Sequence, residues 1–379
     1  MQSKLPIVAT SIFSKMTGLA NQYAAINLSQ GFPEFDTPEL LKSKLAYYSS
    51  EGFNQYSPSV GIKPLQLQIG ELVKRRYHTK IDAEQMVTIT SGATEALFVA
   101  IQAIIHPGDE VIVFDPAYDS YQPAIELAGG KAVHVATHAP DYAINWSQVH
   151  QLMSEKTRAI VINTPHNPSA KTLKLADLTQ LKKLVMQYEL YLISDEVYEH
   201  ITFDNQPHLS VLRDPELLSR SFVVSSFGKT FHCTGWKMGY CIAPTHLTDE
   251  FRKIHQYVTF SSFTPAQLAL TDMLAEQGQH VDELAQFYQI KRDCLIDALS
   301  TSRFRVLPSE GTYFLLLDYS EISSLDDVAF CEYLVKEVGI AAIPLSVFYA
   351  QGSSDKVIRL CFAKKTATLL IAAEKLCQL

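Results

Sequence analysis

From about residue 86 to 243, short β-branched and apolar runs alternate with longer amphipathic segments. The runs are MVTIT, EVIVFD, KAVHVA, RAIVINTP, LYLISDEVY, SFVVSSF and MGYCIAP, and each has the composition of a strand. Between them, residues 94–105 and 175–189 repeat apolar positions every three and four residues, as a helix does. This alternation predicts an α/β fold with a mostly parallel sheet covered by helices.

The pattern changes after a long helical region at about residues 247–300. FRVLP, TYFLLLDY, IAAIPL and VIRLCFA have the pattern of short strands, mixed with a helix at 326–337 and another at the C-terminus. That order predicts a smaller α+β domain. Residues 1–45 are punctuated by proline and lack a sheet pattern of their own, so we expect them to pack on it. The predicted domains are residues 46–275, and residues 1–45 together with 276–379.

Composition excludes several kinds of partner. The 379 residues carry a formal net charge of -8, and Lys and Arg are scattered along the chain. The sequence therefore shows no basic cluster that would bind nucleic acid or an anionic membrane. No apolar run approaches the roughly 18 residues that span a bilayer, and the N-terminus lacks a signal-peptide core. Six cysteines without zinc-like spacing predict reduced thiols, no structural metal and a cytoplasmic location. The expected partner is a small molecule.

Two lysines, Lys229 and Lys237, occur eight residues apart in the segment SSFGKTFHCTGWKMGY. The segment follows a buried strand candidate, and Gly228 interrupts any helical period, so neither lysine fits a solvated helix face. A desolvated lysine beside a second cation has a lowered pKa and becomes nucleophilic toward carbonyl carbons. A surface position is the usual fate of lysine and is the alternative for Lys229.

Other candidates carry charge within apolar runs. Asp195 interrupts LYLISDEVY, so it either has a cationic partner or lies exposed at the strand end. SGATEA, at residues 91–96, suits a phosphate at a helix start, although simple Ser or Thr capping explains it equally well. Arg359 in VIRLCFA needs a carboxylate, from a ligand or from a structural Asp or Glu. Ligands of open α/β sheets lie beyond the carboxyl ends of the strands, so we expect Asp195 and the SGATEA segment to share a site.

Five motifs occur in the order found in the class I aminotransferases, which are pyridoxal phosphate enzymes of fold type I. They are SGATEA, NTPHNPS, SDEVY, SSFGKTF and VIRLCFA, and INLSQGFPEF and NQYSPSVG extend the resemblance to nearly the whole chain. The chain most resembles bacterial methionine aminotransferases and the kynurenine aminotransferase and glutamine transaminase K subgroup. The resemblance implies an enzyme that moves the amino group of methionine, or of an aromatic or other large uncharged amino acid, to a 2-oxo acid.

The resemblance also implies which residues hold pyridoxal 5'-phosphate. Lys229 binds the cofactor covalently and moves the proton at the substrate α-carbon, and Asp195 pairs with the pyridine N–H. Tyr198 and Asn167 donate hydrogen bonds to the 3'-oxygen. Lys237 stands where most relatives have arginine, and it contacts the phosphate as a point charge. The remaining implied contacts are Ala93, Thr94, Ser226, the stacking Tyr118 and, from a neighbouring subunit, Tyr56.

For the substrate, the resemblance assigns the α-carboxylate to Arg359, assisted by the backbone of Gly31 and the Asn167 amide. The side-chain pocket maps to aromatic residues, with Lys15 as the one cation in the same segments. From sequence alone, an ordinary core tyrosine and a loop tyrosine explain Tyr118 and Tyr56 equally well. A homodimer follows from the implied role of Tyr56 across a subunit boundary. The implied pocket residues are Phe13, Phe32, Tyr118, Phe260 and Phe263.

Two other functions stay open at this point. One is β-elimination from cysteine conjugates on the same cofactor, which would release pyruvate and ammonia without an added oxo acid. The other is a non-catalytic regulatory module on the same fold. Relatives of that kind usually carry an N-terminal helix-turn-helix domain, for which residues 1–45 are too short. The sequence NPSA at residues 167–170 departs from the Asn-Pro-Thr-Gly of many relatives and affects the local turn.

Overall fold

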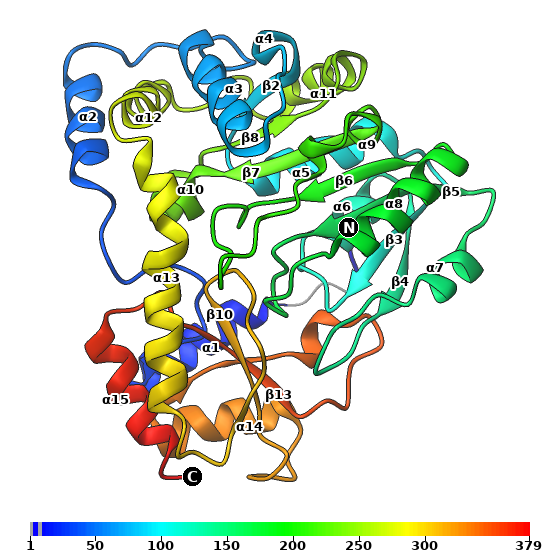
Figure 1. The fold of residues 1–379 in the computed structure, drawn as a ribbon. Coiled ribbons are helices and arrows are strands. Elements are labelled where there is room, and N and C mark those ends of the chain that lie inside the picture. The colour runs from blue at the N-terminus through cyan, green and yellow to red at the C-terminus, as the bar shows by residue number, and fades with distance from the viewer. Residues whose placement is uncertain (1–2, 7–9) are drawn as a thin grey trace.

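A seven-stranded sheet forms the larger part of the computed structural model, which describes residues 3–6 and 10–379. Its strand order is β2-β8-β7-β6-β5-β3-β4 (Figure 1), and β8 runs antiparallel to both of its neighbours whereas the other pairs are parallel. The predicted α/β class is therefore confirmed. The strands are β2 (Val87–Thr90), β3 (Glu110–Asp115), β4 (Lys131–Ala136), β5 (Thr157–Asn163), β6 (Tyr191–Asp195), β7 (Ser221–Ser226) and β8 (Gly239–Ile242).

Helices cover both faces of this sheet, and this is why its strands are continuous apolar runs. In β5, Ile160 and Ile162 belong to the same core as apolar residues of α3, α8 and α12, whereas Val161 belongs to the core on the other face, together with residues of α5. The helices of this part are α2 (Glu39–Ser50), α3 (Lys63–Tyr77), α4 (Ala83–Met86), α5 (Ala93–Ile104), α6 (Tyr121–Leu127), α7 (Trp146–Leu152), α8 (Leu175–Gln187), α9 (Pro215–Leu218), α10 (Phe227–Thr230), α11 (Thr245–Val258) and α12 (Thr264–Glu276).

A second hydrophobic core surrounds a smaller antiparallel sheet of order β12-β13-β10-β9, drawn below the large sheet in Figure 1. Met16 and Ala20 of α1 belong to this core. The elements are α1 (Ile12–Gln22), β9 (Arg305–Val306), β10 (Phe314–Asp318), α14 (Asp327–Tyr333) with a π-helical turn at Leu334–Val338, β12 (Ile343–Pro344), β13 (Val357–Cys361) and α15 (Thr366–Leu376).

Two details of the N-terminal segment differ from the expectation. A two-residue strand β1 (Ile26–Asn27) pairs in parallel with β11 (Ile340–Ala341), and so short a strand leaves no alternating pattern in the sequence. Helix α2 begins at Glu39, and its Leu41 packs in the core of the large sheet instead of the small one. We therefore propose that the boundary between the two domains lies before α2.

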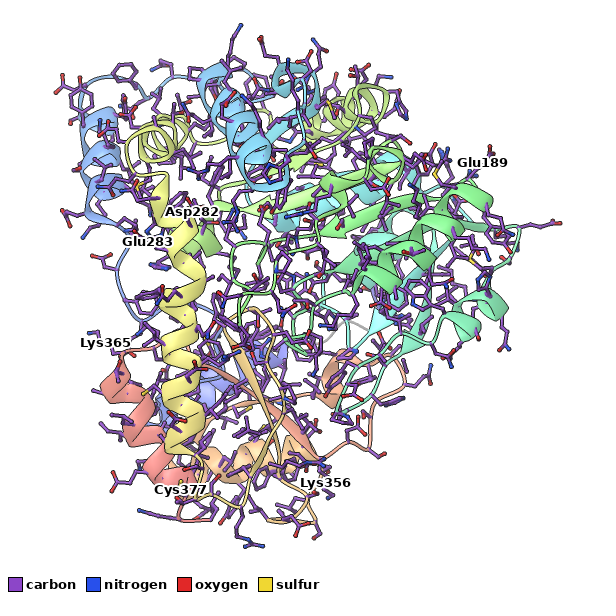
Figure 2. The ribbon with its side chains drawn as sticks, in the orientation of Figure 1. Glu189, Asp282, Glu283, Lys356, Lys365 and Cys377 are labelled. Carbon is purple, nitrogen blue, oxygen red and sulfur yellow. The ribbon has the colours of Figure 1, made fainter. Side chains whose placement is uncertain are left out.

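The long helix α13 (Gln279–Ala298) joins the two parts. Figure 2 shows Asp282 and Glu283 near its start, beside the larger part, and Cys377 near its end, beside the smaller part. Asp282 pairs with Arg76 at 3.1 Å, which fixes the start of α13 to α3. Within residues 3–6 and 10–379, no helix combines the length and the apolar content that crossing a membrane requires.

Candidate active site

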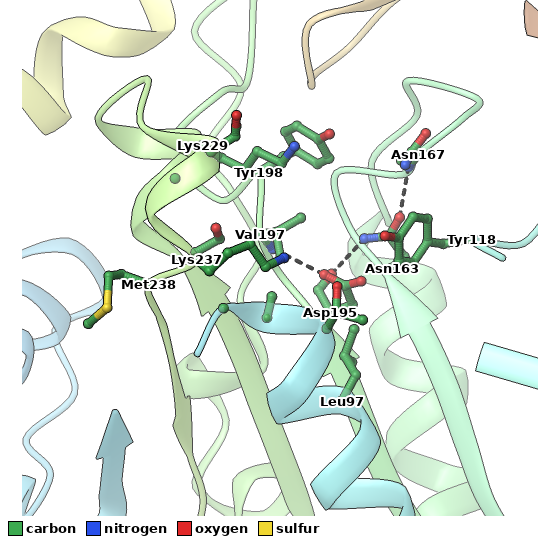
Figure 3. Close-up of a pocket in the computed structure, with 16 residues that line it drawn as sticks. Leu97, Tyr118, Asn163, Asn167, Asp195, Val197, Tyr198, Lys229, Lys237 and Met238 are labelled. Atoms are coloured by element: carbon green, nitrogen blue, oxygen red, sulfur yellow. Dashed lines mark hydrogen bonds between the residues drawn. The ribbon is translucent and has the colours of Figure 1, made fainter. Parts of the chain in front are cut away.

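The carboxyl ends of the central strands open into a cavity of about 160 Å³ (Figure 3). Strand β5 ends at Asn163, β6 at Asp195 and β7 at Ser226, and helix α5 begins against the same space. Parallel strands bring these ends to one edge because their carboxyl ends all point the same way. The residues implied by the resemblance that line the cavity are Ala93, Thr94, Tyr118, Asn167, Asp195, Tyr198, Ser226, Lys229 and Lys237.

Lys229 enters the cavity from the single-turn helix α10, directly after β7. Its amine donates to the Tyr313 hydroxyl at 2.9 Å and to the Gly31 carbonyl at 3.2 Å. Desolvation by burial lowers the pKa of Lys229 to about 8, and the nearby positive charges of Arg359 and Lys237 act in the same direction. A larger share of this amine is therefore neutral near pH 8 than for a solvated lysine.

Asp195 is a buried carboxylate, with 3% of its surface exposed at the end of β6. It accepts a hydrogen bond from the Tyr121 hydroxyl at 2.6 Å and one from the Val197 N–H at 3.3 Å. Burial raises the pKa of Asp195 to about 6 despite these hydrogen bonds. No cationic side chain of the described residues lies within 4 Å of it, so the site is built to receive a cationic N–H from a ligand.

A cradle for an anion lies on the other side of the cavity. Gly92 has φ 86°, and a Cβ placed on it would lie 3.3 Å from the Lys237 side chain, so the backbone and the lysine approach closely. Helix α5 starts at Ala93, and its first N–H groups have no partner within the helix. Ser226 adds a hydroxyl to the lining. A helix start, a hydroxyl and an ammonium group together are suited to a phosphate.

Arg359 on β13 is 1% exposed and has no carboxylate within 4 Å among the residues that the structure describes. Its Nη1 donates to Asn167 Oδ1 at 2.6 Å, its Nη2 donates to the Ser29 carbonyl at 3.2 Å, and its buried Nε has no partner. The ring of Phe314 lies 3.9 Å from the guanidinium carbon. Desolvation lowers the pKa of Arg359. A buried, anion-free guanidinium beside an amide is suited to bind a carboxylate.

The expected pocket aromatics fall into two groups. Phe13 lies near Arg359, with its ring 5.4 Å from the guanidinium carbon, and it contacts Phe348 at 5.9 Å. Phe32 follows Gly31 and is 46% exposed, with the Lys364 amine 4.8 Å from its ring. Within one chain, these two therefore lie beside the residues expected to bind the substrate.

Tyr56, Phe260 and Phe263 lie elsewhere on the chain. Tyr56 is 81% exposed and forms an edge-to-face contact with Phe260 at 5.0 Å, and neither it nor Phe263 lines the cavity. Tyr257, Val258, Phe260 and Phe263 belong to one segment, and Tyr56 packs against it. We call Tyr56 and these four residues the aromatic patch; each of the five is at least 46% exposed.

Sequence reasoning missed three residues of this site. Tyr121 holds Asp195, Tyr313 holds Lys229, and Asn163 donates to the Asp195 carbonyl at 2.8 Å while accepting from the Asn167 N–H at 2.7 Å. Asn163 begins the quoted segment NTPHNPS, four residues before Asn167, and Tyr121 follows Tyr118 by three residues, so both lie close to residues that were singled out. Their polar ends, placed just after strand candidates, were the available signal.

Comparisons with known proteins agree with this geometry. Residues 24–376 match the family model described as "Aminotransferase class I and II". The chain is 54% identical to the methionine aminotransferase of Escherichia coli over 378 residues, which cover 100% of this chain and 98% of that protein. It is 31% identical to kynurenine–oxoglutarate transaminase 1 of Mus musculus, covering 96% and 94%. A crystal structure of an Escherichia coli protein identified as a methionine aminotransferase superposes with a TM-score of 0.98 at 54% identity, covering 100% and 99%.

Proposed function

Because this chain belongs to the class I and II aminotransferase family and is an aminotransferase, we propose that it uses pyridoxal phosphate and prefers methionine and other large uncharged amino acids as donors. The observation that carries the proposal is the pairing, in one cavity, of a lysine with lowered pKa and a buried carboxylate that lacks a cation. The 54% identity over the whole chain supports the choice of methionine.

The residues present fit pyridoxal phosphate. Asp195 would hold the pyridine N–H, and the start of α5 with Ser226 and Lys237 would hold the phosphate. When bound, the cofactor supplies an electron sink that stabilises negative charge on the substrate α-carbon. Asp195 keeps the pyridine nitrogen protonated, because its own charge is buried and lacks another cationic partner.

Lys229 carries the proton transfer in this proposal. Its lowered pKa leaves part of the amine neutral near neutral pH, so Lys229 would hold the cofactor, and its neutral amine would accept the proton from the substrate α-carbon. Tyr313 and the Gly31 carbonyl hold the amine from the side of the small sheet. Tyr198 lies beside Lys229, with the amine 5.5 Å from its ring centre, and it orients the cofactor together with Asn167.

Arg359 selects the α-carboxylate of the substrate. The guanidinium has donors available because its Nε is unpartnered, and the hydrogen bond to Asn167 fixes its plane. Burial excludes water from this ion pair and strengthens it. The same arginine serves the amino acid and the 2-oxo acid, since both carry this group.

The preference for uncharged side chains follows from the surroundings of the pocket. Phe13 and Phe32 present apolar surface, and Lys15, the one cation in the pocket segments, is paired with Glu332 at 2.9 Å. The other amine near these aromatic residues, that of Lys364, donates to the Phe32 carbonyl at 3.1 Å. A second substrate carboxylate would therefore meet no unpartnered amine in the described segments around Phe13 and Phe32, and burying it unpaired costs several kcal/mol. An apolar side chain instead gains about 1.5 to 3 kcal/mol from burial.

We also infer that the active form is a homodimer in the cytoplasm. The aromatic patch is exposed in a single chain, and covering it with a second subunit would remove apolar surface from water. Tyr56 would then reach the phosphate end of the partner's cavity. The six cysteines are unpaired, which supports a reducing compartment.

The test is a donor comparison on the purified protein with pyridoxal phosphate. Methionine, phenylalanine, glutamine, kynurenine and aspartate are each assayed with one common oxo acid. We expect methionine or an aromatic donor to exceed aspartate by roughly a hundredfold in kcat/KM. Aspartate as the fastest donor would overturn the substrate proposal. Borohydride treatment followed by peptide mass mapping should fix the cofactor on Lys229, and labelling of another lysine would overturn its assigned role.

A further inference from the structure

A second cavity, of about 420 Å³, shares Asn163 with the catalytic cavity, and it is also lined by Tyr121, which donates to Asp195. It lies at the ends of β3 and β5 and is closed by residues 141–144 and 171–177. Its walls are largely apolar, with Phe114, Ile144 and Leu173 among them. This volume and this lining are typical of a small-molecule site, and no residue of the proposed reaction needs it.

Lys171 is the cation of this cavity that has no partner. It is half-buried, and no carboxylate of the described residues lies within 4 Å of its amine. Desolvation lowers the pKa of Lys171. The neighbouring Lys174 is different, because it pairs with Glu310 at 2.7 Å. The negative charges of Glu310 and Asp141 raise this pKa in part, but neither forms an ion pair with Lys171. Taking a cation partly out of water costs free energy, so an anionic ligand in direct contact would stabilise Lys171.

Asp141 is an exposed carboxylate in the lining of the same cavity, and its negative charge acts on Lys171 without forming an ion pair with it. The other two carboxylates of the cavity are occupied: Glu310 binds Lys174 and accepts from Thr172, and Asp177 accepts from Trp146 at 3.0 Å. Asp141 has no cation within 4 Å among the described residues. The cavity thus offers one free positive charge, one free negative charge and an apolar interior.

We propose that this cavity binds a free α-amino acid with an apolar side chain. Lys171 receives the carboxylate, Asp141 receives the ammonium group, and the side chain lies between Phe114, Ile144 and Leu173. A zwitterion satisfies both unpaired charges at once, whereas a simple carboxylate satisfies only one. The site goes beyond the proposed transamination, since its charged residues do not line the catalytic cavity.

Asn163 and Tyr121 give this site a route to the reaction. Asn163 holds the Asp195 carbonyl and the Asn167 N–H, and Tyr121 holds the Asp195 carboxylate. A ligand bound in the second cavity contacts Asn163 and Tyr121 directly. These two residues position Asp195, which faces the cofactor site, and Asn167, which accepts a hydrogen bond from Arg359. Binding there is thereby coupled to the catalytic cavity through two side chains.

The probe is radiolabelled α-methyl-L-phenylalanine, which has no α-proton and is not consumed, in equilibrium dialysis with the holoenzyme. We expect two equivalents bound per subunit in the wild type. Lys171→Met should weaken one of them at least tenfold, and Lys174→Met, a matched substitution of the paired lysine, should leave both. One equivalent in the wild type with no effect of Lys171→Met, or two unchanged equivalents in Lys171→Met, would overturn the proposal.

Two further binding measurements distinguish an error in the proposed function from an error in this second site. Arg359→Met should remove the catalytic equivalent and keep the one that depends on Lys171, so loss of the proposed function and loss of this site give different results. 3-Phenylpropionate, which lacks the ammonium group, should bind the second cavity at least tenfold more weakly than the amino acid. Equal binding of 3-phenylpropionate would overturn the role of Asp141.

Discussion

Replacing Asp195 with asparagine should make the enzyme slower and the cofactor-free protein more stable. The substitution keeps the shape of the side chain, and the Tyr121 hydroxyl can reverse its hydrogen bond to accept from the new amide. Only the buried negative charge is lost. The two effects have opposite signs because the charge is costly in the empty site and useful once a cationic pyridinium lies beside it.

The magnitudes follow from burial. A charge pair about 4 Å apart is worth about 4 kcal/mol at the effective dielectric of a protein, against about 1 kcal/mol in water, and Asp195 is 3% exposed. We therefore expect kcat to fall about a thousandfold. The pKa of Asp195 is raised from 3.8 to about 6, and a difference of about 2 pKa units corresponds to about 3 kcal/mol. That is the largest gain in the free energy of unfolding that Asp195→Asn can give.

The gain in stability depends on pH in a defined way. The folded protein binds the Asp195 proton more tightly than the unfolded chain does, so the charge destabilises the fold above pH 6. This cost shrinks as the pH falls through 6 and disappears below 3.8. The stabilisation by Asp195→Asn should be close to its maximum at pH 8 and about half of it at pH 5.

Urea unfolding of the cofactor-free protein at both pH values measures the stability, and single-turnover kinetics with methionine measure the activity. Asp297→Asn, which alters an exposed aspartate of α13 without an ion pair, is the matched control and should change neither. The reasoning is refuted if Asp195→Asn destabilises the cofactor-free protein at pH 8. It is equally refuted if kcat stays within tenfold of the wild type at saturating cofactor.

Three further substitutions test other parts of the site and of the surface. Lys229→Ala should fold and lose at least about a hundredfold in turnover, because the α-proton loses its base; turnover within tenfold would contradict this. Arg359→Lys should lower kcat/KM for methionine about thirtyfold, since about 2 kcal/mol of charge-assisted hydrogen bonding is lost; a change below twofold would show that the guanidinium fork is not used. Phe260→Asp should yield monomers in sedimentation, whereas Leu175→Asp, at a residue 70% exposed on α8, should not; a stable Phe260→Asp dimer would place the interface elsewhere.

The sequence predicted the elements of the large sheet well because its strands are buried on both faces. EVIVFD and KAVHVA coincide with β3 and β4, and the helix expected at 175–189 is α8. The short β1 was missed because two residues carry no period. The packing of Leu41 of α2 in the core of the large sheet depends on partners distant in sequence, which the local pattern does not show. Local patterns determine elements, whereas packing depends on contacts between remote segments.

The active site shows the same difference between what local sequence patterns reveal and what depends on contacts between remote segments. Lys229 and Asp195 were found because a charged residue within an apolar segment is conspicuous in a sequence. Tyr313 could not be found in this way, since a tyrosine in TYFLLLDY fits an ordinary core strand and its partner Lys229 lies 84 residues away. Tyr121 was likewise hidden, because its link to Asp195 spans 74 residues. Hydrogen bonds between residues so far apart in the sequence cannot be recognised from the local spacing of residue types.

The hydrogen bond between Arg359 and Asn167 is one of the contacts that connect the two hydrophobic cores, together with those of Lys229 to Tyr313 and Gly31. Arg359 lies on β13 of the small sheet, and Asn167 follows β5 of the large one. A carboxylate held by both residues would act as a crosslink between the two cores, so that neither could melt without releasing it. Bound substrate analogue should thus raise the cooperativity of thermal unfolding, merging the melting of the two parts into one calorimetric transition.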